Sequence, residues 1–172
     1  MRKQKGFSLI ELLIVVAIIL IIAAIAIPNL LRAKIAANES SAAASVRTLT
    51  TAQIEYSTSY PNNGFGANLT VLGPGTGNST CVSTGPTSGA ACIVDAVLAA
   101  GTKSGYTIST TGLTAVNGAN TQFVTTAFPQ TAGSTGVKGF CAVEDGVVRW
   151  LTPAMTSVYT ADSSCTALSA LQ

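Results

Sequence analysis

The chain has 172 residues, which gives room for one globular domain beyond a hydrophobic N-terminal segment. Only 9% of the residues are charged and histidine is absent, which excludes Ser-His-Asp and Cys-His catalytic sites. Three of the nine basic residues lie before residue 7, so the rest of the chain has six basic and seven acidic residues. The main part of the chain is therefore nearly neutral, and no specific nucleic-acid partner is expected.

Residues 7–27 form an apolar run whose one charged side chain is Glu11. Twenty or so apolar residues make a helix of about 30 Å, which is long enough to cross a bilayer. The basic residues Arg2, Lys3 and Lys5 precede this run, so the positive-inside rule predicts a cytoplasmic N-terminus and an exported remainder. A carboxylate inside such a span costs roughly 2.5 kcal/mol or more on insertion scales, so Glu11 is expected to have a use.

A cleaved secretory signal peptide is the alternative interpretation of this segment, with a small-residue cleavage site at residues 24–26. The apolar run is longer than the usual 7–15 residues or so of such a signal, and Glu11 would weaken insertion near its start. These two features favour a single membrane span that carries an external domain.

Residues 5–12, with the sequence Lys-Gly-Phe-Ser-Leu-Ile-Glu-Leu, closely resemble the prepilin processing site of type IV pilins and type II secretion pseudopilins. The resemblance extends from residue 1 to about residue 60 and implies a leader that a membrane prepilin peptidase removes between Gly6 and Phe7. It also implies that the same enzyme methylates the new N-terminal amine of Phe7. Glu11 occupies the family's glutamate position, and Pro28 occupies its usual proline position.

The resemblance gives Glu11 a role in assembly. Cleavage before Phe7 removes the basic leader and creates an amine, and Glu11 of an incoming subunit can pair with the Phe7 amine of its neighbour. In a low-dielectric helix bundle an unpaired charge is strongly disfavoured, so this pair is expected to set the axial register of the subunits.

Residues 29–60 continue a helical pattern with charged residues interspersed. Pro28 is expected to kink or locally melt one long helix, which is interrupted there and ends before Pro61. Apolar side chains spaced three, four or seven residues apart predict a stripe that packs on a domain: Ile35, Ala42, Val46, Leu49, Ala52, Tyr56 and Tyr60.

The remainder of the chain predicts an antiparallel sheet. Residues 61–89 are rich in Gly, Asn, Pro, Ser and Thr and predict a loop, and residues 90–100 predict a short helix stopped by Gly101. Partial alternation and threonine content predict four strands. These are residues 106–110, 122–127, 137–143 and 147–151, with a hairpin turn at 144–146 and a C-terminal loop over residues 152–172.

These elements predict an α+β fold, in which a long N-terminal helix packs on an antiparallel sheet of about four strands, as the pilin resemblance also implies. The expected organisation has four parts. They are a leader peptide (1–6), a hydrophobic transmembrane and polymerisation helix (7–28), its amphipathic continuation (29–60) and a globular pilin head (61–172).

Four cysteines, Cys81, Cys92, Cys141 and Cys165, follow the hydrophobic segment. An even number in an exported domain favours two disulfides, whereas the absence of histidine and of C-x-x-C spacing disfavours zinc. Of the three possible pairings, Cys81–Cys92 with Cys141–Cys165 is the simplest because it closes two local loops.

The sequence thus favours a structural subunit of a bacterial type IV pilus, held in the inner membrane before assembly and extracellular afterwards. The implied partners are copies of the same chain, the prepilin peptidase, and the assembly platform and motor; no enzyme activity, cofactor or metal is expected. A type II secretion pseudopilin is the alternative of the same class. A minor pilin that acts as a binding module is the alternative of another class.

Overall fold

The computed structural model describes residues 7–75, 80–83, 85–154 and 156–171. The leader and Gly6, and with them the expected cleavage junction, lie outside these residues. The chain divides into two compact units, Met1–Lys34 and Ile35–Gln172, here called the N-terminal unit and the C-terminal unit.

Helix α1 spans Leu9–Ser59 and contributes residues to both units. It remains helical through Pro28, so the predicted interruption at this residue is wrong. Proline removes one backbone donor, and a break that is confined to one hydrogen bond does not end a helix whose neighbouring turns are intact. The helix ends before Pro61, as predicted, because a proline disfavours helical backbone at the residue before it.

The C-terminal unit contains a six-stranded antiparallel sheet in the order β1-β2-β3-β4-β5-β6. The α+β class is as predicted, but the sheet has six strands instead of about four. The two additional strands, β1 and β6, have two residues each, too few to show a period of two in the sequence. The strands are β1 (Thr102–Lys103), β2 (Tyr106–Val116), β3 (Ala119–Pro129), β4 (Gly139–Val143), β5 (Arg149–Leu151) and β6 (Ser169–Ala170).

Strands β2 and β3 form a hairpin that is much longer than the sequence pattern predicts, with 11 residues in each strand. Asn117 and Gly118 connect them, and both have positive φ angles, of 53° and 86°. Asn-Gly is the residue pair that a tight hairpin turn of this type favours. This dipeptide was the signal in the sequence that would have extended both predicted strands to the turn.

Short helices replace parts of the predicted loops: α2 (Leu69–Leu72), α3 (Thr80–Ser83) and α5 (Asp162–Thr166). The helix predicted over residues 90–100 is restricted to α4, Ala96–Ala99. Asp95 begins this helix by accepting a hydrogen bond from the backbone N–H of Leu98 at 2.7 Å. The residues before Asp95 instead donate backbone hydrogen bonds to the segment around α2, so tertiary pairing overrides their helical propensity.

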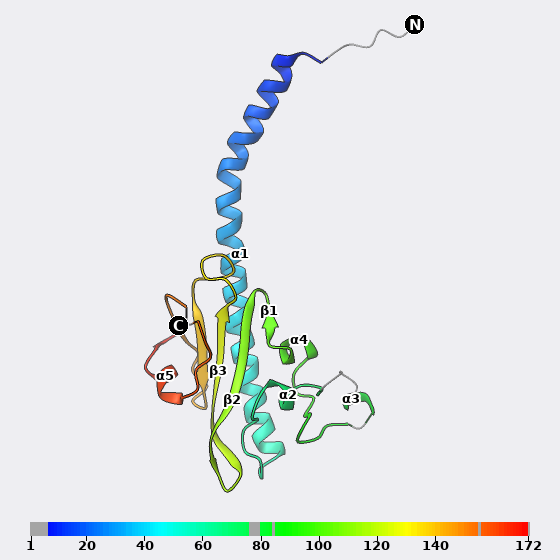
Figure 1. Cartoon of the computed structure of the whole chain (residues 1–172), viewed down its shortest axis with the longest axis vertical. Helices are drawn as coiled ribbons and strands as arrows, with labels where there is room; N and C mark the ends of the chain where they lie inside the picture. Colours follow the sequence, from blue (N-terminus) through cyan, green and yellow to red (C-terminus); the bar gives the residue numbers. More distant parts are fainter. Residues whose placement is uncertain (1–6, 76–79, 84, 155, 172) are drawn as a thin grey trace. The chain divides into compact units, whose positions relative to one another are not determined.

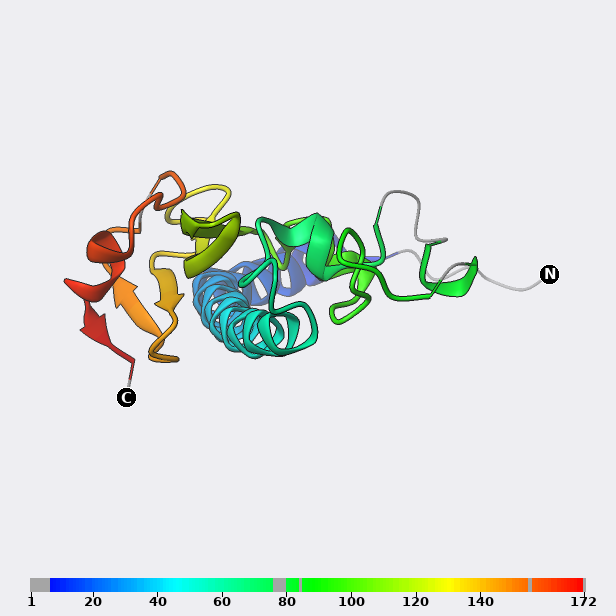
Figure 2. The same ribbon diagram turned by 90° about the horizontal axis from the view of Figure 1, so that it is seen from below.

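In the C-terminal unit, α1 lies along one face of the sheet (Figures 1 and 2). The apolar stripe of α1 and this face of the sheet form the core of the unit. Tyr60 packs partly against this core, whereas Ile35 is half-buried outside it. The opposite face of β4 packs in a second cluster with Cys165 of α5, because alternate residues of a strand point to opposite faces. The buried stripe residues are Ala42, Val46, Leu49, Ala52 and Tyr56.

The segment that precedes the sheet in the sequence and the segment that follows β5 lie on opposite sides of the C-terminal unit. In Figures 1 and 2, α5 and the C-terminal segment (red) lie on one side, and the segment that contains α2, α3 and α4 (green) lies on the other. This arrangement follows the sheet order, in which β1 and β6 form the two edges.

Candidate assembly surface

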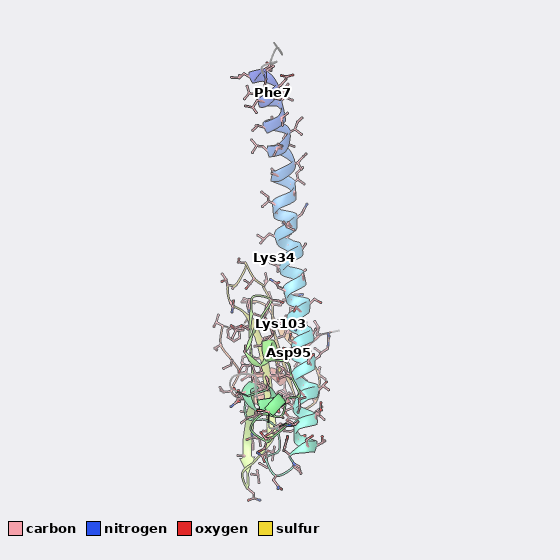
Figure 3. All side chains as sticks on the ribbon, turned by 90° about the vertical axis from the view of Figure 1, so that its right-hand side faces the viewer. Phe7, Lys34, Asp95 and Lys103 are labelled. Carbon is pink, nitrogen blue, oxygen red and sulfur yellow. A yellow bond between two sulfur atoms is a disulfide. The ribbon has the colours of Figure 1, made fainter. Side chains whose placement is uncertain are left out.

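The N-terminal unit exposes its apolar side chains. Among residues 7–34, Ala23 is half-buried and all the others are exposed. Phe7 is 76% exposed and Ile27 is 65% exposed, and the side chains between them radiate from the helix (Figure 3). This part of α1 is long and apolar enough to cross a membrane. A continuous apolar surface of this size is typical of a segment that a membrane or another protein covers.

Glu11 lies at the beginning of this helix and holds its first turn. The backbone N–H of Ser8 donates a hydrogen bond to Glu11 Oε2 at 2.9 Å, and the N–H of Leu12 donates to the carbonyl of Ser8 at 3.3 Å. Ser8 stands at the cap position and Glu11 three residues later, which is the spacing of a capping box. Glu11 therefore has a partner within its own helix in addition to the pairing expected with another subunit, and the Ser-x-x-Glu spacing in the sequence signals this local bond.

The residues singled out from the sequence fall into two sets. Phe7, Glu11 and Pro28 belong to the N-terminal unit, where Phe7 and Glu11 lie at the same end of α1. Pro28 follows Glu11 by about 25 Å along the helix, at 1.5 Å per residue or so. The four cysteines all belong to the C-terminal unit.

Two disulfides hold the C-terminal unit. Cys81 of α3 is bonded to Cys92, and Cys141 of β4 is bonded to Cys165 of α5, the simplest of the three possible pairings. Cys141 and Cys165 are fully buried beside Val143, so the second bond fixes the C-terminal segment to the far face of the sheet.

A buried polar network joins α1 to the sheet, which the sequence pattern did not reveal. The Gln53 amide is fully buried and donates to the Gly66 carbonyl at 3.0 Å and to Thr110 Oγ1 at 2.9 Å. Its oxygen accepts from the Gly66 N–H at 2.7 Å, and Thr110 is bonded to Thr125 at 3.0 Å. Because all these groups have partners, the network can fix how α1 sits on β2 and β3.

The charged groups of the C-terminal unit show one ion pair among the described residues, between Arg149 and Asp145 at 2.5 Å. The hydrogen bond from Arg149 lowers the pKa of the Asp145 carboxyl, and the same bond raises the pKa of Arg149. Burial raises the pKa of Tyr106, whose hydroxyl donates to the Lys138 carbonyl at 2.8 Å. The described residues contain no group of three or more His, Cys, Asp or Glu side chains that could hold a metal ion.

Comparison with known proteins agrees with the N-terminal features. Residues 1–27 match the family model of the prokaryotic N-terminal methylation motif. The chain is 67% identical over 39 residues to the type IV wide pilus major component PilA4 of Thermus thermophilus, a match that covers 23% of this chain and 30% of that protein. It is 51% identical over 51 residues to the type IV major pilin protein PilA of Myxococcus xanthus, which covers 30% of this chain and 23% of that protein.

These matches cover less than a third of the length of either curated relative. No solved structure matches the chain significantly. The methylation motif and the two pilins confirm the resemblance to type IV pilins. The matched segments are short, at 27, 39 and 51 residues, so most of the C-terminal unit is described from its structure alone.

Proposed function

We propose that this chain is a structural subunit of a bacterial type IV pilus, which polymerises through the exposed apolar part of α1. The observation that carries the proposal is an N-terminal methylation motif that continues into an apolar helix with nearly all its side chains exposed. Both curated relatives are named as major pilus components, which favours a pilus over a secretion pseudopilus.

The proposed subunit begins at Phe7 after a prepilin peptidase removes residues 1–6. Residues 7–28 then serve as the transmembrane and polymerisation helix, residues 29–60 as its amphipathic continuation and residues 61–172 as the head. The subunit waits in the inner membrane, with its N-terminus cytoplasmic, and enters an extracellular filament with the help of a separate assembly platform and motor. Assembly exchanges lipid contacts of the apolar helix for contacts with the helices of other copies.

Glu11 is proposed to set the register of this polymer. In the single chain its carboxylate accepts the hydrogen bond from the N–H of Ser8, which leaves it at the helix end where the processed amine of Phe7 would also lie. In a water-free helix bundle the amine of a neighbouring copy is a stronger partner than a backbone N–H, because both groups carry charge. A shift of one copy along the axis would separate these charges, so only one register is favourable.

The test is to shear filaments from cells that express the chain and to sequence the mature subunit by mass spectrometry. We expect long filaments made of this chain, with methylated Phe7 as the first residue. A mature chain that starts after Ala26 would show an ordinary signal peptide, and a processed chain that never enters sheared filaments would favour the pseudopilus.

A further inference from the structure

The C-terminal unit has a cavity of about 250 Å³ on its surface, between α1 and β4. Its apolar lining includes the buried side chains of Ala43 and Phe140, and the cations Arg47 and Lys138 also line it. Glu39 also lines it, but one oxygen of this carboxylate already accepts hydrogen bonds from the backbone N–H groups of residues 137 and 138, at 2.9 and 3.1 Å. Among the described residues that line the cavity, two cations stand against one carboxylate, so this lining has a net positive charge.

Within the described part of the chain, neither cation has an ionic partner. Among the described residues the one ion pair joins Arg149 to Asp145, and Arg47 and Lys138 take no part in it. The Lys138 ammonium lies 5.0 Å from the centre of the Trp150 ring, a contact that holds the cation in place without neutralising it. The cavity is therefore suited to a ligand group that combines a carboxylate with a small apolar side chain.

The turn between β4 and β5 has this chemistry. Its residues 144–147, Glu-Asp-Gly-Val, are all exposed, and the Val147 side chain is 38% exposed. The turn is held in shape by hydrogen bonds from Gly146 N–H to the Val143 carbonyl at 3.0 Å and from Val147 N–H to Asp145 Oδ1 at 2.9 Å. Arg149 neutralises Asp145, so Glu144 supplies the net negative charge.

The cavity and the turn lie at opposite ends of the same strand. Lys138 directly precedes β4 and Glu144 directly follows it. At about 3.3 Å per residue, the six steps between them span about 20 Å, so the two side chains of one copy cannot meet. A contact between them must join two copies, and because it uses different surfaces on the two partners it can repeat from copy to copy. Such a contact closes into a ring if the rotation between copies allows it, and otherwise it produces an open row of subunits.

We propose that the β4–β5 turn of one copy docks in the α1–β4 cavity of the next copy, with Glu144 beside Lys138 and Arg47. This inference rests on the proposed polymeric function and adds to it a contact between heads that is separate from the N-terminal helices. Such charge complementarity contributes to the choice of partner and orientation more than to affinity.

The first test uses wild-type filaments and a zero-length carbodiimide, which joins a lysine to a carboxylate only when the two are in contact. Mass spectrometry of the digest should show an amide between Lys138 and Glu144, which the length of β4 forbids within one copy. The proposal is overturned if Glu144 couples to Lys103 or Lys34 instead, or if Lys138 couples only to the chain's terminal carboxylate.

The second test is a charge exchange in the full chain. Lys138→Glu and Glu144→Lys alone should each reduce the yield of sheared filaments roughly three- to tenfold, and the double variant should recover to within about twofold of wild type. Lys103→Glu, in β1 (Figure 3), and Glu55→Lys, on the exposed face of α1, make the same charge changes outside the cavity and the turn. These controls should change the yield by less than about twofold.

The double variant distinguishes loss of the contact from loss of the fold. It carries both substitutions, so a fold that either one damages would stay damaged, whereas an exchanged charge pair would restore the contact. If the Lys138→Glu chain fails to accumulate in membranes, the same comparison of single and double variants can be made with Arg47→Glu in place of Lys138→Glu, combined with Glu144→Lys. A filament yield that none of these charge reversals changes would overturn this contact alone. A double variant whose filament yield is no higher than that of the single variants would do the same. Absence of filaments from the wild type would overturn the pilus proposal, and this contact with it.

Discussion

Helix α1 carries the same kind of side chain in two opposite environments. Leu20, in the N-terminal unit, is 63% exposed, whereas Leu49, in the C-terminal unit, is 0% exposed. The two residues belong to one helix, so the difference arises from what the rest of the chain supplies around them. The sheet covers the helix beside Leu49, but no described part of the chain covers the apolar surface around Leu20.

The polar groups of the two regions differ in the same way. Gln53 of the C-terminal unit bonds to Gly66 and Thr110, which lie far from it in the sequence. Glu11 of the N-terminal unit bonds to Ser8, three residues away. The buried amide of Gln53 is thus satisfied by segments that are distant in the sequence, whereas the Glu11 carboxylate is bonded within the first turn of its own helix.

The largest expected effect concerns Glu11. The variant Glu11→Gln retains an oxygen that can accept the hydrogen bond of Ser8, but it carries no charge to pair with an amine. We expect normal membrane levels and normal cleavage, with a yield of sheared filaments more than about tenfold lower, because an unpaired amine in the bundle is costly.

Glu55→Gln is the matched control, since it makes the same change on the exposed face of α1 in the C-terminal unit. Its filament yield should equal that of the wild type. Normal filaments from Glu11→Gln would show that the capping bond, and not the charge, is what Glu11 provides.

The second prediction concerns the free energy of unfolding, which should respond differently to substitution of Leu49 and of Leu20. Leu49→Ala should lower the free energy of unfolding of the C-terminal unit by about 3 kcal/mol, because it leaves a cavity in the core. Leu20→Ala should change it by less than about 0.5 kcal/mol. Urea unfolding of the full chain in detergent, followed by the fluorescence of its one tryptophan, Trp150, measures both. Equal losses would mean that the two parts of α1 unfold as one unit.

The smallest of the three effects concerns the buried network. Gln53→Ala should cost about 2 kcal/mol in the same unfolding measurement, because it leaves buried groups of Gly66 and Thr110 without their partner. The control is Gln122→Ala, whose side chain bonds to Thr114 and Glu144 in exposed positions and should cost less than about 0.5 kcal/mol. A Gln53 variant as stable as the control would show that water replaces the lost bonds.

The elements of the C-terminal unit show where sequence patterns succeed and where they fail. The buried stripe of α1 was predictable, because Val46, Leu49 and Tyr56 repeat at helical spacing. The length of the β2–β3 hairpin was missed, since the alternation of its outer half is weak and the Asn117-Gly118 turn was not recognised. The helix predicted over residues 90–100 was too long, because its first half pairs with the backbone around α2.

The candidate assembly surface was more predictable than the head. An apolar run, a single carboxylate at Glu11 and a motif around Gly6 and Phe7 are local features, and a continuous run of sequence contains all of them. The capping bond between Ser8 and Glu11 is local as well, and its Ser-x-x-Glu spacing was available in the sequence.

By itself, the sequence determined the features that depend on neighbours along the chain: the apolar helix, its end before Pro61 and the motif at its beginning. Only the tertiary structure decided the partners of Gln53, the two edge strands β1 and β6, and the placement of a cationic cavity and an acidic turn at opposite ends of β4. The physical reason is that hydrophobic periodicity is fixed by local geometry, whereas contacts between distant segments depend on how the whole sheet and helix pack.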